Sequence, residues 1–180
     1  MDLKKIIVNS LEYNLWVNEQ YCHWLSEKSD VLLNMHVESS FPSILLTIQH
    51  ILHTQEYWSS VLQGQLNLPI EQNQIDPEQP KLDRKTIFTS LIESSRNVLQ
   101  YIKGLNDSEL LKSVEIKNEW FTCDFTKLEY VQQLTFHGAY HRGQIITIGR
   151  NIGIVDAPLT DYNFWNLYKD RTELVAYGIQ

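Results

Sequence analysis

The sequence predicts an all-α protein with four long helices, formed as a single domain over residues 1–180. Long segments with little or no proline and glycine carry apolar residues at helical spacing, as amphipathic helices do. Between the second and third segments, residues 63–82 form a polar stretch with three prolines. Helix bundles use such crossovers to let two consecutive helices run in the same direction.

The first helix is predicted over residues 3–27, where neither proline nor glycine occurs. The second is predicted over residues 42–62, because serines and Pro42 supply a start signal and Gly64 follows the end. Asp83 is a candidate cap for the third helix, which ends at Gly104.

The region before the fourth helix has shorter elements. "NDSEL" is typical of one helical turn, and "SVEIKNEWFTCDF" alternates partly about a polar centre, which indicates a small hairpin. Thr126 and Glu129 have capping-box spacing at the start of the fourth helix, which runs to about Asn151. Thr160 or Asp161 could cap a last short helix.

Composition limits the possible functions. The net charge is −7 and the pI about 5.3, so we expect no binding to nucleic acid or to anionic membranes, both of which need a basic face. No apolar run approaches the length of about 20 residues that spans a bilayer, and no signal peptide is recognisable. Cys22 and Cys123 lack a metal-type spacing, which favours reduced thiols in a cytoplasmic protein.

Two histidines lie in the apolar stripe of the fourth helix. On a helical wheel centred on His137, the residues within roughly 80° are mainly apolar and include His141. These residues are Tyr130, Leu134, His141, Ile145 and Ile148. Both histidines therefore face the bundle interior, where an unpartnered polar group costs about 1–3 kcal/mol.

The second helix contributes two more histidines. Its apolar side is marked by Ile44, Ile48, Ile51, Trp58 and Leu62. His50 lies roughly 120° from the centre of that side and His53 nearly opposite it. His50 is thus the better inward candidate, while His53 is expected to face solvent or a subunit contact.

Together His50, His137 and His141 could supply three imidazole ligands to a metal. Three protein ligands leave a position for water or substrate, as catalytic sites do. Imidazole suits several divalent transition metals, of which zinc and nickel are the first choices. Position 138 is glycine, so the H-E-x-x-H pattern of zinc peptidases is absent. The alternative is that the histidines are structural, because spacing of four residues alone is weak evidence.

Four ordered segments resemble the DinB (damage-inducible) superfamily of bacterial four-helix-bundle proteins. They are "YNLWVN", "SFPSILLTIQHILHTQEYW", "HGAYHRGQI" and "PLTDYNFW". The resemblance covers nearly the whole chain, with the long crossover in the expected place. It implies an up-down-down-up bundle, often a homodimer, with a metal bound by His50, His137 and His141. Relatives include S-transferases that use bacillithiol or glutathione and a mycothiol-dependent isomerase.

Three functions are compatible with these patterns. The first is a metal-dependent enzyme that transfers a low-molecular-weight thiol to a small electrophile. The second is a non-catalytic metal-binding or ligand-binding protein of the stress response, and the third is an interaction module with structural histidines. Arg142 is a candidate for binding a carboxylate of the thiol cofactor, although an ion pair or a solvated helix position is the simpler expectation.

Overall fold

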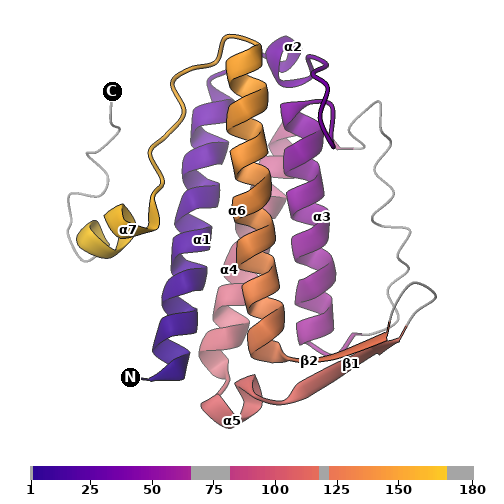
Figure 1. The fold of residues 1–180 in the computed structure, drawn as a ribbon, viewed down its shortest axis with the longest axis vertical. Coiled ribbons are helices and arrows are strands. Elements are labelled where there is room, and N and C mark those ends of the chain that lie inside the picture. The colour runs from indigo at the N-terminus through magenta and orange to yellow at the C-terminus, as the bar shows by residue number, and fades with distance from the viewer. Residues whose placement is uncertain (1, 66–81, 118–121, 170–180) are drawn as a thin grey trace.

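The computed structural model describes residues 2–65, 82–117 and 122–169, and four long helices dominate it (Figure 1). They are α1 (Leu3–Ser26), α3 (Ile44–Leu62), α4 (Arg84–Gly104) and α6 (Lys127–Asn151). The predicted all-α bundle is confirmed. The predicted crossover falls mainly on residues 66–81, which lie outside the described residues. Within the described part of the chain, no helix is long and apolar enough to cross a membrane.

Hydrogen bonds between α3 and α4 show that these consecutive helices run in the same direction. Gln49 near the start of α3 accepts from the backbone N–H of Leu82, just before α4. At the other end, the hydroxyl of Tyr101 in α4 donates to the carbonyl of Leu62, the last residue of α3. Later residues of one helix thus pair with later residues of the other.

α1 and α6 also run in the same direction, whereas the pairs α1–α4 and α3–α6 are antiparallel. The carbonyl of Lys28, just after α1, accepts from Arg84 at the start of α4, whereas Glu12 pairs with Lys103 at its end. α6 returns alongside α3 in the opposite direction, as Figure 1 shows. The topology is therefore up-down-down-up, as the sequence resemblance implied.

Short elements connect the long helices. They are α2 (Asp30–Leu33), α5 (Asp107–Leu110), β1 (Ser113–Lys117), β2 (Thr122–Thr126) and α7 (Tyr162–Tyr168). β1 and β2 form an antiparallel hairpin, so that prediction is confirmed, with residues 118–121 outside the described residues. α2 was not predicted, although Ser29 before Asp30 is a capping signal, and its side chain accepts from the N–H of Leu32.

Most predicted helix starts are confirmed by their caps. The side chain of Asp83 accepts from the N–H of Thr86 at 3.0 Å, and Thr126 and Glu129 form a reciprocal capping box. Asp161, one of the two candidates, caps α7. The second predicted helix begins at Ile44, two residues after Pro42, and its cap is Ser43, the last serine of the predicted start signal.

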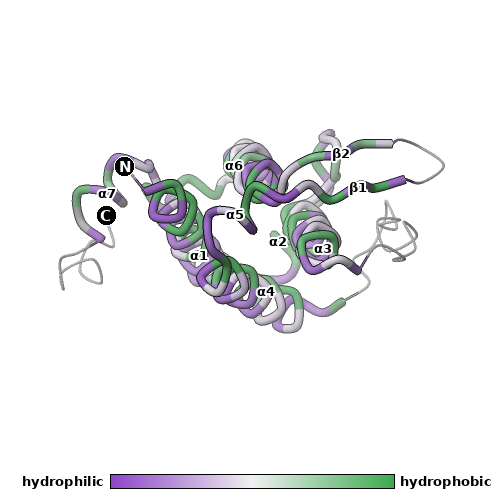
Figure 2. Tube along the Cα trace, turned by 90° about the horizontal axis from the view of Figure 1, so that it is seen from below, coloured by the Kyte–Doolittle hydropathy of each residue, from purple (hydrophilic) through white to green (hydrophobic). Residues whose placement is uncertain are grey.

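The core consists of two apolar clusters that lie one above the other along the bundle. One contains Leu25, Ile48, Leu91 and Ile145, and the other contains Leu11, Leu62, Ile102 and Val131. Figure 2, seen from the hairpin end, shows the four long helices arranged around this interior. Every long helix contributes to both clusters.

A buried polar layer separates the two clusters. It consists of Asn14 and Asn18 from α1, Gln55 from α3, Ser95 from α4 and Arg142 from α6. Nη1 of Arg142 donates to Oδ1 of Asn14 at 3.0 Å and to Oδ1 of Asn18 at 2.8 Å. Asn14 continues to Gln55 and Asn18 to Ser95, so hydrogen bonds link all four long helices.

Two glycines of α6 should respond oppositely to alanine. A Cβ on Gly138 would lie 2.9 Å from Nη1 of Arg142 and 3.3 Å from Oδ1 of Asn14, whereas one on Gly143 meets no atom within 4 Å. We expect Gly138→Ala to lower the free energy of unfolding by about 1–3 kcal/mol, because the held guanidinium must move. Gly143→Ala should raise it by about 1 kcal/mol through helix propensity.

Urea denaturation of both variants against the wild type checks this pair of effects. Each variant is the matched control of the other, since the substitution and the helix are the same. Equal shifts in the denaturation midpoint would contradict the close contact at Gly138.

Candidate metal centre

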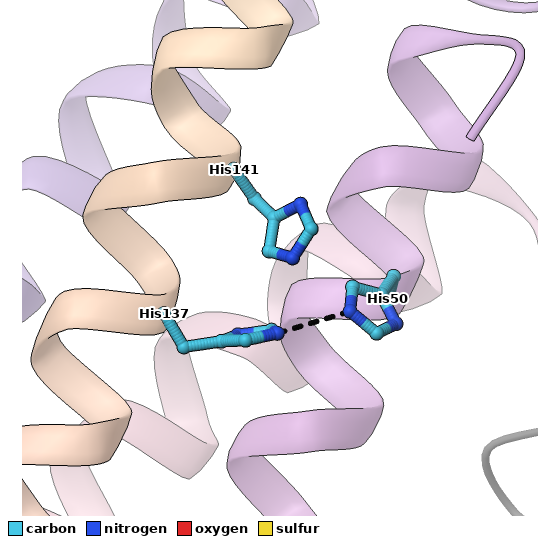
Figure 3. A group of neighbouring side chains, drawn as sticks. All are labelled: His50, His137 and His141. Carbon is cyan, nitrogen blue, oxygen red and sulfur yellow. Dashed lines mark hydrogen bonds between the residues drawn. The ribbon is translucent and has the colours of Figure 1, made fainter. Parts of the chain in front are cut away.

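Three histidines from two helices converge on the seam between α3 and α6 (Figure 3). His50 comes from α3, and His137 and His141 come from successive turns of α6. Nε2 of His50 lies 3.0 Å from Nε2 of His137. One potential ligand atom from each of the three side chains lies within 4.8 Å of the others. The structure thus brings together the histidines that the sequence singled out.

The spacing of these nitrogens suits a small transition metal. A tetrahedral ion with metal–nitrogen bonds of about 2.0–2.1 Å holds two ligand atoms about 3.3 Å apart. The 3.0 Å separation of the Nε2 atoms of His50 and His137 is close to this value, and the three ligand atoms lie within 4.8 Å of one another, so the side chains would draw together around an ion. Among the described residues, the group contains no carboxylate and no thiol, and this all-imidazole set fits zinc, nickel, iron or copper.

Gln144 holds His141 in the orientation that such a site needs. Nδ1 of His141 lies 2.7 Å from Oε1 of Gln144, three residues along the same helix. Because an amide oxygen only accepts, Nδ1 carries the proton and Nε2 keeps its lone pair for a metal. Partners of this kind fix the tautomer and the ring angle of histidine ligands.

Aromatic rings cover the two sides of the cluster. Phe41 stacks on His50 with ring centroids 4.1 Å apart and meets the edge of His141 at 5.6 Å. Tyr140 packs against His141 at 4.9 Å. Phe41 was not among the predicted site residues, although apolar residues that shortly precede a helix cap, here Ser43, often pack back onto the helix.

The histidines are neutral at pH 7. Burial, followed by repulsion from His137 and His141, lowers the pKa of His50 to about 3. Burial and the neighbouring His141 lower the pKa of His137 to about 4, and burial also lowers the pKa of His141. Neutral imidazoles offer free lone pairs, which a metal requires.

The depressed pKa values predict a pH effect on the metal-free protein. Since the unfolded chain binds these protons near pH 6.5, the folded state should lose stability as the pH falls from about 6.5 toward 4. Urea denaturation with a chelator between pH 4.5 and 7.5 measures this loss. His50→Gln should make the dependence shallower, whereas His23→Gln, at an exposed position of α1, should not. Identical pH profiles for all three proteins would contradict the prediction.

The other candidates lie elsewhere. His53 does not belong to the cluster, and it is half-buried rather than solvent-facing. Arg142, the predicted binder of a cofactor carboxylate, is 4 % exposed and its guanidinium contacts Asn14 and Asn18 in the polar layer. It is neither solvated nor ion-paired to a described carboxylate, which corrects the simpler expectation. A cofactor would have to reach a guanidinium that is buried inside the bundle.

Comparison with known proteins agrees with this architecture. The model of the DinB family matches residues 2–172 of the chain. The chain belongs to the DinB family. A relative from Bacillus subtilis (strain 168), Protein DinB, is 31 % identical over 175 residues, and the alignment covers 90 % of this chain and 94 % of that protein. The three clustered histidines of this DinB family member, His50, His137 and His141, lie within the matched segment.

Proposed function

We propose that His50, His137 and His141 bind one divalent transition metal, with zinc and nickel the first choices. The observation that carries the proposal is the convergence of three neutral imidazoles within 4.8 Å on one helix seam. The half-buried Nε2 atoms of His50 and His137, 3.0 Å apart, need either a shared proton or a cation between them. Three ligands leave one position open, which is the pattern of catalytic rather than closed sites.

We further propose that the open position serves the transfer of a low-molecular-weight thiol to a small electrophile. A metal held there lowers the pKa of a bound thiol, so that the thiolate is available near neutral pH. The sulfur then bonds to the electrophilic carbon, the thiol proton passes to solvent, and in a haloarene a halide ion leaves. Among the described residues, the cluster contains no carboxylate to activate water, which favours thiol transfer over hydrolysis.

The protein's own residues contribute position and exclusion of water. Gln144 holds the ring of His141, and Phe41 covers a face of His50 and makes an edge contact with His141 on the side of the α2–α3 connection. Side chains that exclude water from the site would strengthen the electrostatic effect of a bound cation on the thiol. A non-catalytic metal-binding or ligand-binding protein is the alternative that the same geometry allows.

Metal analysis of the wild-type protein, purified without a nickel column or chelator, should find close to one transition metal per chain. The metal-loaded protein should accelerate the conjugation of bacillithiol, glutathione or coenzyme A to a haloarene or a maleimide-like acceptor, above the uncatalysed rate. Chelation should abolish the acceleration and added metal should restore it. Bound metal without acceleration by any thiol would favour the non-catalytic alternative.

A further inference from the structure

A pocket of about 620 Å³ lies on the same α3–α6 seam, on the hairpin side of the three histidines. Side chains from α3, β2 and α6 line it, including Trp58, Phe125, Tyr130, Gln133 and Phe136. Gln133 precedes His137 by one helical turn, which is a rise of about 6 Å, and lies on nearly the same face of α6. The pocket and the candidate metal centre are therefore neighbours.

The walls of the pocket are aromatic. Trp58 and Tyr130 stack with ring centroids 5.2 Å apart, and the edge of Phe125 meets Tyr130 at 5.9 Å. The hydroxyl of Tyr130 donates to the carbonyl of Val114 at 2.9 Å, so this ring is held in place from behind. Phe136 is 67 % exposed on the rim and has an open ring face.

The charges of the pocket indicate what kind of group it accepts. Among the described lining residues there is no cation, and the one carboxylate, Glu129, is already engaged by Thr126 in the capping box of α6. An anionic group would find no partner here, whereas an uncharged ring would gain stacking contacts worth about 0.5–1.5 kcal/mol each. The volume lies within the range of small-molecule sites.

A second pocket on the other side of the histidines differs in character. It measures about 260 Å³ and is lined by polar residues, among them Glu38, Gln144 and Asn151, and by the apolar side chains of Val37, Tyr140 and Ile148. Its lining mixes hydrogen-bonding groups with apolar side chains, whereas rings dominate the larger pocket. The two pockets therefore flank the histidines and differ in size and in lining.

We propose that the aromatic pocket binds the planar, uncharged ring of the electrophile and so selects aromatic acceptors for the thiol. That the bound ring is a substrate rests on the proposed function. The ring lies between Trp58 and Phe136 and directs its reactive carbon along the seam toward His137. The smaller pocket is left for the thiol.

Binding of 1,3-dinitrobenzene to the full chain, measured by calorimetry, tests the pocket directly. This ring mimics an activated haloarene but has no halide to displace, so it does not arylate Cys123 in the pocket. We expect Phe136→Ala and Phe125→Ala each to weaken binding about fivefold to tenfold, because each removes a ring contact at an exposed position. Binding should change less than twofold on chelation of the metal.

Tyr140→Ala is the matched control, since it removes another exposed aromatic ring from α6 that does not line this pocket. It should change the affinity for dinitrobenzene less than twofold. No binding, or an equal loss in the Tyr140 and Phe136 variants, would overturn the proposal. The proposal is also overturned if the wild type binds no ring and the Phe136→Ala substitution dissociates a dimer in sedimentation. The aromatic pocket would then be covered by a second copy of the chain.

Failure of this inference is separable from failure of the proposed function. If dinitrobenzene binds and the Phe125 and Phe136 variants weaken binding as expected, but no thiol is conjugated, only the proposed transferase activity is overturned. If conjugation occurs, Phe136→Ala should raise KM for a haloarene about fivefold to tenfold and leave KM for the thiol unchanged. Conjugation with unaltered KM for the haloarene would overturn only the pocket assignment.

Discussion

Replacing either His137 or His141 by alanine should reduce the bound metal from close to one per chain to near zero. In the proposed site each histidine is one of three ligands, so its loss would leave two imidazoles and water. Even loss of a group that only orients a ligand lowers metal affinity about 10-fold to 100-fold, and loss of the ligand itself should cost more. His50→Ala should have the same effect, and thiol conjugation should disappear with the metal.

His53→Ala is the control, since it removes a half-buried histidine of the same helix that lies outside the cluster. Metal content by mass spectrometry and helix content by circular dichroism should be measured on the same samples. The ligand assignment is wrong if the His53 variant loses metal while the His50 variant retains it. Full metal content in all four variants would show that the ion binds elsewhere.

Arg142→Ala should be the most destabilising single substitution on α6. It removes a buried guanidinium and leaves Oδ1 of Asn14 and of Asn18 without their donor. Leaving a buried acceptor without a donor costs about 1–3 kcal/mol for each of the two oxygens, which lowers the melting temperature of a chain of this size by about 10 °C. Arg142→Lys should recover only part of the loss, because an ammonium lacks the planar fork of guanidinium.

Arg150→Ala serves as the control, because this arginine lies exposed in the last turn of the same helix. Its effect should stay within about 0.5 kcal/mol. Thermal and urea unfolding measure both variants, and a double-mutant cycle with Asn14→Ala should show strong coupling. Equal stability of the Arg142 and Arg150 variants would refute the structural role assigned to the polar layer.

Much of this architecture is predictable from sequence because it depends on local patterns. Capping at Asp83 and at Thr126 involves residues only three apart, and helical periodicity places both histidines of α6 on one face. His50 was preferred over His53 by the same geometry, and the structure brings His50 into the cluster. The homodimer, the cytoplasmic location and the identity of the metal stay predictions.

The environment of Arg142, the position of Phe41 and the aromatic pocket were not predicted, because they depend on contacts between segments that are distant in the sequence. The direction of the Arg142 side chain is set by Asn14 and Asn18, more than 120 residues earlier in the chain. No periodicity within α6 reveals those partners. Phe41 likewise gains its role only when the two histidines that it covers are brought together, and the aromatic pocket needs three separate elements.

The polar layer also has a consequence for how such a sequence can diverge. Sliding α6 by one turn, about 5.4 Å, would move Arg142 away from both asparagines and press its charge against one of the apolar clusters. The polar layer therefore fixes the position of α6 along the bundle axis, and this keeps His137 and His141 level with His50. Apolar residues above and below it can be exchanged for others of similar volume, while the height of the histidines along the bundle is preserved.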